Sequence, residues 1–211
     1  MEIYGGILVF DKIDLEDFWD DTEYAQAEYV SEPVTDDMIQ EIEHDLGYKL
    51  PQSYINFMKK HNGGMPKKTA CPCDSATSWA DDHVSIRGFY GIGKQKKNSL
   101  GGHWGSRFWI EQWEYPDIGI AICDCPSAGH DMIFLDYSEC GRMGEPRVVH
   151  IDQEFDFKIT VLADNFEEFL EKLCLEEEFK EDDISEDAGK SGIVSAWFSD
   201  EFWNKLNSKK E

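Results

Sequence analysis

The residues best suited to chemistry are six cysteines, and two pairs of them have a single residue between them, Cys71-Pro-Cys73 and Cys123-Asp-Cys125. Structural zinc sites mostly use a Cys-x2–4-Cys spacing, in which the chain turns back so that both sulfur atoms face one ion. Two cysteines one residue apart on an extended strand also share a face, so a zinc site is an alternative. We interpret these residues as buried, reduced thiols and predict that the protein holds no metal and no cofactor.

A histidine, a cysteine and several carboxylates lie close together in the sequence between residues 124 and 136. Cys125 could act as a nucleophile with His130 as its base, which requires their side chains to lie within hydrogen-bond distance. The neighbouring Gly129 instead favours a turn in which Asp131 bonds the backbone. We favour the turn, with catalysis or metal binding as the alternative. The sequence contains none of the common nucleophile, phosphate-binding, zinc-protease or dinucleotide motifs, so we predict no catalytic residues and no enzyme.

Four tryptophans, at positions 79, 104, 109 and 113, are interleaved with acidic residues. A strand predicted over 108–113 would place Trp109, Glu111 and Trp113 on one face and the residues between them on the other. Tryptophan side chains often anchor protein interfaces, and carboxylates select basic partners. We therefore predict that this face points outward, with core packing as the alternative for any single tryptophan. The predicted partner-binding residues are Trp109, Glu111, Trp113, Glu114, Asp81 and Asp82.

The charge of the chain limits what it can bind. The 44 Asp and Glu residues outnumber the 20 Lys and Arg residues, which gives a formal net charge of −24. This charge argues against binding to nucleic acid phosphates or to anionic membranes, because both need Lys and Arg to neutralise them. It favours a basic protein partner. We interpret the small cationic group of Lys94, Lys96 and Lys97 as a solvated loop, with a phosphate site as the alternative.

The composition indicates a folded protein of the cytoplasm. Hydrophobic residues make up 41% of the chain and aromatic residues 13%, which is too many for a disordered acidic chain. No apolar run approaches the roughly 20 residues of a membrane-spanning helix. Residues 1–4 also lack the basic start of a secretion signal, so we expect a cytoplasmic protein whose thiols stay reduced.

The clearest structural pattern is a pair of helices early in the chain. Thr35 is a typical helix N-cap, apolar residues recur at helical spacing from position 38 to 46, and Gly47 ends the helix. Pro51 suits the first position of a second helix, which ends at the glycines of residues 63–64. The short link between the two helices predicts a tight helical hairpin.

The rest of the chain alternates strand-like segments with turn residues. Strands are predicted over 84–88, 89–93, 108–113, 118–123, 132–136, 148–152 and 158–162. Asn165 then caps one more helix. This order of elements indicates the α+β class. Four parts are expected: an acidic N-terminal extension at 1–34, an α+β domain at 35–175, an acidic linker at 176–192, and an amphipathic C-terminal helix or tail at 193–211.

A motif runs through the helical hairpin. It consists of an acidic helix, Leu46-Gly47, two spacers, Leu50-Pro51, Tyr54 and a closing Asn62-Gly63-Gly64. This motif resembles the opening of the SUKH superfamily, whose members are of the Smi/Knr type. Residues 124–136 resemble the family's Gly/Asp-rich turn and the apolar strand after it, and residues 145–154 resemble the next strand. The resemblance covers residues 35–175, and it implies a mixed or antiparallel sheet flanked by the hairpin and a C-terminal helix, with structural roles for the motif residues.

The resemblance also carries an expectation about function. The resemblance implies a non-enzymatic binding protein. The bacterial members of the family resemble immunity proteins that bind and neutralise toxin domains, which are often nucleases. The fungal members regulate cell-wall glucan synthesis through protein contacts. We therefore expect an immunity protein that neutralises a basic, nuclease-type toxin domain of a polymorphic or contact-dependent toxin system. The alternative is an acidic regulatory scaffold of the cell-wall synthesis type.

Overall fold

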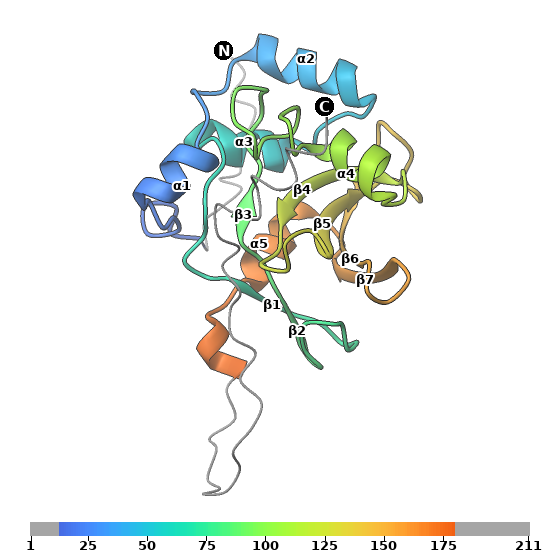
Figure 1. The fold of residues 1–211 in the computed structure, drawn as a ribbon. Helices are drawn as coiled ribbons and strands as arrows, with labels where there is room; N and C mark the ends of the chain where they lie inside the picture. The colour runs from blue at the N-terminus through green and yellow to red at the C-terminus, as the bar shows by residue number, and fades with distance from the viewer. Residues whose placement is uncertain (1–12, 180–211) are drawn as a thin grey trace, which may run out of the picture. The chain divides into compact units, whose positions relative to one another are not determined.

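A computed structural model of the 211-residue chain describes residues 13–179 (Figure 1). The predicted tail at 193–211 and most of the predicted linker at 176–192 lie outside the described residues. The helices are α1 (Glu23–Glu28), α2 (Asp36–Leu46), α3 (Gln52–Lys60), α4 (Ser106–Trp113), α5 (Phe166–Lys172) and the short 3-10 helix η1 (Glu176–Phe179). The strands are β1 (Ala70–Pro72), β2 (His83–Ser85), β3 (Gly88–Phe89), β4 (Gly119–Asp124), β5 (Asp131–Asp136), β6 (Arg147–Asp152) and β7 (Lys158–Ala163).

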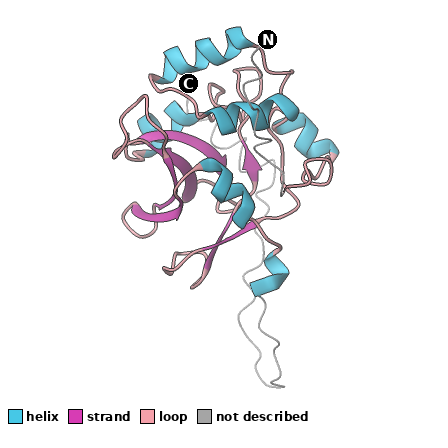
Figure 2. Ribbon diagram, turned by 180° about the vertical axis from the view of Figure 1, so that it is seen from behind, coloured by secondary structure: helices cyan, strands magenta, loops and turns pink. Residues whose placement is uncertain are grey.

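An antiparallel sheet organises the domain and confirms the predicted α+β class. Its five strands follow the order β3-β4-β5-β6-β7, so each strand pairs with its neighbour in the chain. Every residue of the central strand β5 is buried, as expected for the apolar segment 132–136. Figure 2 shows α5 crossing one face of the sheet. β1 and β2 form a separate two-stranded hairpin.

The predicted helical hairpin is confirmed. The Thr35 side chain accepts a hydrogen bond from the Met38 backbone N–H and so caps α2, and Gly47 ends the helix with a φ of 77°. α3 begins immediately after Pro51. Asn62 then joins distant backbone groups, because its side-chain amide donates to the carbonyl of Ile92 at 3.0 Å and its oxygen accepts from the Ile92 N–H at 2.7 Å.

The left-handed backbone of Gly47 leads to a testable prediction. Replacing Gly47 with valine should reduce the free energy of unfolding by about 1 kcal/mol or more, because a branched side chain is strained at this φ. Space is a smaller difficulty, since an added Cβ would meet only the flexible end of Arg142 at 3.1 Å. Thermal unfolding of Gly47→Val should show the loss, and Gly47→Asn should retain more stability because asparagine tolerates this conformation. An unchanged melting temperature for Gly47→Val would contradict the strain.

The prediction of a strand over 108–113 is wrong, because these residues belong to helix α4. Aromatic residues favour strands locally, but here Trp109 and Trp113 pack against each other at helical spacing, with ring centroids 5.3 Å apart. The helix starts after Gly105 and ends at Glu114, which has a left-handed φ of 62°. Where strands were predicted over 84–88 and 89–93, the structure has only the short strands β2 and β3, which overlap these segments in part, and β1 was not predicted.

The described part of the N-terminal segment, residues 13–34, packs onto the α+β domain. Phe18 and Trp19 are buried, and the Phe18 ring lies edge-on to Phe57 of α3 at 5.2 Å. Tyr29 is also fully buried, and its hydroxyl donates to the carboxylate of Asp124 at 3.0 Å. In residues 13–179, no helix is both long enough and apolar enough to cross a membrane.

Candidate functional site

Trp109, which was predicted to face outward, is a core residue. Only 8% of it is exposed. Its indole N–H lies within hydrogen-bond distance of the Tyr90 hydroxyl, at 3.1 Å, and of the Trp104 carbonyl, at 2.9 Å. The predicted exposure is therefore wrong for this residue. The cause is the helix: successive residues rotate by about 100°, so Trp109 and Glu111 cannot share a face as they would on a strand.

The other predicted residues near α4 do reach the surface. Glu111 and Glu114 are exposed, the first on α4 and the second at the residue that ends it. Arg107 lies 3.4 Å from the Glu111 carboxylate. Trp113 is half-buried, and its ring lies edge-on to His130 at 6.0 Å. This end of α4 thus offers two carboxylates beside part of an aromatic ring.

Asp81 and Asp82 lie elsewhere, on the loop between β1 and β2. Both are exposed, and the Asp82 carboxylate lies 2.8 Å from Nδ1 of His83. Figure 1 shows the outer end of this hairpin well separated from α4. The six residues predicted from the sequence therefore fall in two places.

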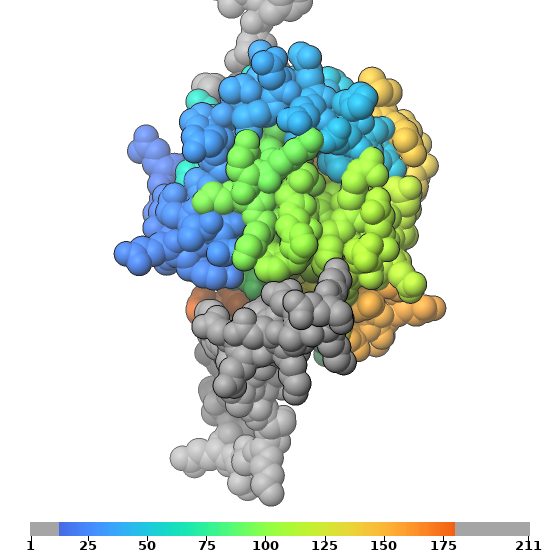
Figure 3. All heavy atoms as spheres, turned by 45° about the horizontal axis from the view of Figure 1, so that its top comes forward, coloured from blue at the N-terminus to red at the C-terminus, as the bar shows by residue number. Residues whose placement is uncertain are grey.

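Several partly exposed aromatic side chains around the start of α4 were not predicted as a site. His103 lies 5.9 Å from the Phe108 ring, and the Lys97 ammonium lies 5.2 Å from the Trp104 ring, within the range of a cation–π contact. Figure 3 shows α2, the loop that precedes α4, and α4 itself as one continuous face. We name this the α2–α4 surface, and its residues are Glu41, His44, Asp45, Lys97, His103, Trp104, Arg107, Phe108, Glu111, Trp113 and Glu114.

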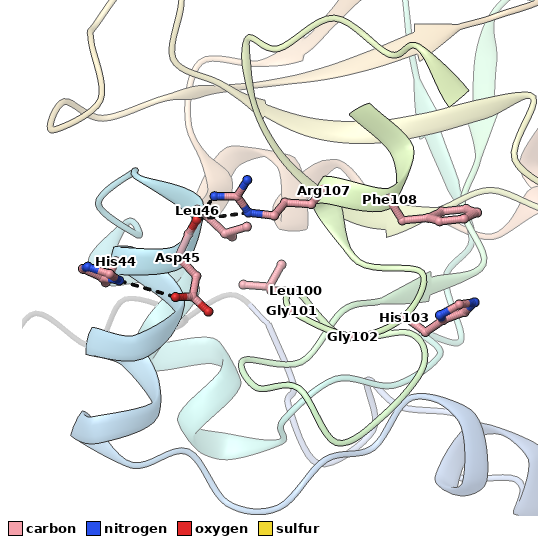
Figure 4. A pocket seen from close by; sticks show the side chains of 9 residues that line it. All are labelled: His44, Asp45, Leu46, Leu100, Gly101, Gly102, His103, Arg107 and Phe108. Atoms are coloured by element: carbon pink, nitrogen blue, oxygen red, sulfur yellow. Dashed lines mark hydrogen bonds and ion pairs between the residues drawn. The ribbon is translucent and has the colours of Figure 1, made fainter. Parts of the chain in front are cut away.

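A shallow pocket of about 480 Å³ lies within the α2–α4 surface. Leu46, Leu100 and Phe108 provide its apolar lining. The Arg107 side chain crosses one side and donates to the Asp45 carbonyl at 3.1 Å (Figure 4). No sequence spacing signalled this pocket, because its walls come from segments more than fifty residues apart.

The lysines of the loop are occupied within the molecule. Lys94 lies 2.7 Å from Glu41 and 2.5 Å from Asp45. Hydrogen bonds from Lys94, and then from His44, lower the pKa of Asp45, which therefore stays charged. Lys96 donates to two carbonyls at the end of α1, each at 2.9 Å. These contacts hold the loop against α1 and α2. Lys94 and Lys96 are therefore bonded within the molecule, which argues against both a phosphate site and a free cationic patch here.

The turn predicted around Gly129 is present, but the predicted bond from the Asp131 side chain to the backbone is not, because this carboxylate lies 2.7 Å from His150 Nε2. Gly129 has a φ of 100°, and the Asp131 backbone N–H donates to the Ser127 hydroxyl at 3.0 Å. His130 is exposed and lies 2.7 Å from Glu154, whereas Cys125 is buried, so the structure does not support His130 as a base for Cys125. Burial raises the pKa of the Cys125 thiol well above its ordinary value, with the Asp131 charge adding to the shift. A protonated, buried thiol is a poor nucleophile.

A buried cluster of three polar residues beneath this turn was not predicted from the sequence. It consists of Cys125, Asp131 and His150, each buried, with potential ligand atoms that all lie within 4.8 Å of one another. The sequence could not pair Asp131 with His150, because the ladder between β5 and β6 brings them together. The six cysteines are all unpaired thiols.

Comparison with known families identifies this architecture. A SUKH family model described as SMI1-KNR4 cell-wall matches residues 36–170, more than half of the chain. The chain belongs to the SUKH family. The matched range of this SUKH domain begins at the first residue of α2 and includes the whole α2–α4 surface. It also confirms the resemblance drawn from the helical hairpin motif. No curated protein matched the chain.

Proposed function

We propose that this SUKH domain is a non-enzymatic protein-binding module that acts as an immunity protein, and that it neutralises a basic, nuclease-type toxin domain in the cytoplasm. Membership of the SUKH family supports a role in protein binding. Nuclease domains are usually cationic because they must hold a phosphate backbone. A chain with a net charge of −24 is suited to such a partner.

The observation that carries the proposal is the exposure of the acidic residues of the N-terminal segment and α2. Ten carboxylates in this segment are exposed: Asp14, Glu16, Asp17, Asp20, Asp21, Glu23, Glu32, Asp36, Asp37 and Glu41. Some are balanced by lysines, as in the pair of Lys59 with Asp36. The remaining field can steer a cationic protein toward this side of the molecule and raise its association rate.

The α2–α4 surface adjoins these carboxylates and supplies the kind of contact that slows dissociation. Half-buried aromatic rings such as Trp104, Phe108 and Trp113 are already partly ordered by packing, so they lose little freedom when a partner covers them. We place the centre of the contact on this surface, with Glu111 and Glu114 facing basic residues of the toxin domain.

The absence of enzymatic activity is part of the proposal. Cys125, Asp131 and His150 together could perform acid–base or nucleophilic chemistry, but each of them is at most 1% exposed. A substrate would have no access to them. Their burial supports a binding role for the surface above them.

A charge test follows from the proposed contact. Replacing both Glu111 and Glu114 with glutamine should slow association with the toxin domain, because it removes attraction near the contact and leaves the dissociation rate nearly unchanged. Raising the salt concentration should slow association of the wild type as well, since charges are screened beyond about 8 Å at about 0.15 M salt. Stopped-flow or surface-binding kinetics would measure both effects.

The matched control is the double variant Asp81→Asn and Asp82→Asn, which changes the net charge by the same amount on the β1–β2 loop. A larger fall in the association rate for this control would move the contact to the hairpin. An association rate that does not depend on salt would contradict electrostatic steering altogether.

The description of the matched family refers to the cell wall and so favours a second candidate function, a regulatory scaffold for cell-wall synthesis. The two functions are separated by co-expression. If the chain is an immunity protein, it should restore growth to cells that express the toxin domain encoded beside it. A scaffold would give no such protection and should instead co-purify with cell-wall synthesis proteins.

A further inference from the structure

Three side chains with metal-binding atoms meet in the interior, below the turn that joins β4 to β5. Cys125 follows the last residue of β4, Asp131 is the first residue of β5, and His150 lies in β6. Cys125 and His150 have no exposed surface, and Asp131 is 1% exposed. Their ligand atoms all lie within 4.8 Å of one another. The group could share one ion after small movements of its side chains, and it is shielded from water.

The hydrogen bonds available inside the domain do not satisfy this group. His150 Nε2 lies 2.7 Å from Asp131 Oδ2, whereas Asp131 Oδ1 and His150 Nδ1 have no nitrogen or oxygen partner, and the Cys125 thiol is the remaining donor toward the Asp131 carboxylate. The hydroxyl of Thr160, directly opposite His150 in the β6–β7 ladder, is also without a partner. The described residues contain five such buried atoms, and three of them belong to this place. Because a buried polar atom without a partner is costly, their concentration here points to a missing bonding partner.

The three donors match the preferences of zinc. A thiolate, an imidazole and a carboxylate are all common Zn²⁺ ligands, and the soft sulfur disfavours magnesium or calcium. The charges also balance, since a thiolate and a carboxylate together carry the two negative charges that a divalent ion neutralises. We propose, contrary to the metal-free protein expected from the sequence, that Cys125, Asp131 and His150 bind one Zn²⁺ ion.

Binding changes the bonds in a defined way. The Cys125 thiol loses its proton to solvent as its sulfur coordinates the ion. The hydrogen bond between His150 and Asp131 is replaced by one metal bond from each of these residues. The ring nitrogen of His150 that does not bind the ion then needs an acceptor for its hydrogen, and the Thr160 hydroxyl is the polar group opposite it. Since the site has no opening to solvent, the ion is captured as the chain folds.

The site also supports the α2–α4 surface. Gly129, in the turn between Cys125 and Asp131, lies so close to α4 that an added Cβ would come within 2.5 Å of the Trp109 ring. The hydroxyl of Tyr115 donates to the Gly129 carbonyl at 2.7 Å. An ion bound to both ends of the turn and to β6 would stabilise the turn against which α4 packs.

The test uses the full chain, expressed in zinc-supplemented medium and purified without chelator. Metal analysis should find one zinc ion per chain in the wild type. Cobalt added during refolding should give the absorption of an ion with a thiolate ligand. Cys123→Ser is the matched control, because Cys123 is an equally buried thiol two residues away that lies outside the group. It should keep both signals, whereas Cys125→Ser should lose the metal and the thiolate absorption.

Two further measurements keep the proposal falsifiable if Cys125→Ser fails to fold. After removal of metal under denaturing conditions, wild type refolded with Zn²⁺ should have a higher melting temperature than wild type refolded without it, because the ion binds the folded state, and Asp131→Asn should weaken that rise. A wild type that is purified without zinc and shows neither a shift in melting temperature nor a cobalt spectrum would overturn the site. Zinc retained at full stoichiometry by folded Cys125→Ser would overturn it as well.

Discussion

Replacing Trp109 with alanine should lower the free energy of unfolding by about 3–5 kcal/mol, which is the usual cost of removing a buried tryptophan. The side chain is 8% exposed, and its indole N–H bonds within the core, to the Tyr90 hydroxyl at 3.1 Å and the Trp104 carbonyl at 2.9 Å. Its loss would leave a cavity between α4 and the sheet and remove the contact with the Gly129 turn. Urea unfolding followed by circular dichroism would measure the change.

Trp113→Ala is the matched comparison on the same helix. Trp113 is only half-buried, so its truncation should cost clearly less stability than that of Trp109. If the α2–α4 surface binds the toxin domain, Trp113→Ala should also speed dissociation of the folded protein from it. Equal losses of stability for the two variants would show that Trp113 belongs to the core and remove it from the proposed contact.

Replacing Arg87 with methionine should cost a similar amount, about 3–5 kcal/mol at neutral pH, because it leaves a buried carboxylate without its cation. The Asp124 side chain is 3% exposed, and Arg87 Nε donates to it at 2.8 Å. Tyr29 would remain as a hydrogen-bond donor, but a neutral hydroxyl cannot replace the charge. Arg107→Met is the control, since the exposed pair of Arg107 with Glu111 should contribute little.

The loss in Arg87→Met should also depend on pH. Burial raises the pKa of Asp124 even in the wild type, where Arg87 is the main opposing influence. Without Arg87 the pKa of this carboxyl in the folded protein rises further above its value in the unfolded chain. The folded state then binds a proton more tightly, so the variant should be most stable at acidic pH and lose stability as the pH rises through the folded-state pKa. A loss that is the same at acidic and neutral pH would contradict the assignment.

The sequence predicted those elements whose signals are local. The helical hairpin was predicted from the Thr35 cap and the stop at Gly47, both of which act within a few residues. The central strand was predicted because a continuous apolar run can be buried only between two layers. For residues 108–113 the local signal was misleading, since aromatic residues suit both a strand and a buried helix and only the contact of Trp109 with the core decides between them.

The candidate sites depended on distant contacts that no spacing reveals. Glu111, Trp113 and Glu114 were predicted near a surface, but the pocket beside them needs the end of α2. From the sequence, Cys125 and Asp131 were candidates for a site, and His130 was the histidine expected to act with them. In the structure the histidine beside Asp131 is His150, because the register of β5 with β6 brings these two residues together.

The packing of residues 13–34 onto the domain affects how the protein should be divided for experiments. The family match starts at residue 36, yet Phe18 covers the ring of Phe57, and Tyr29 completes the bonds of Asp124. At the other end, Cys174, which lies beyond the matched range, forms an antiparallel β-bridge with Ala70. A fragment trimmed to 36–170 would expose aromatic rings to water and leave a buried charge pair incomplete, so it should be poorly soluble. Binding measured on such a fragment would underestimate the affinity of the whole protein.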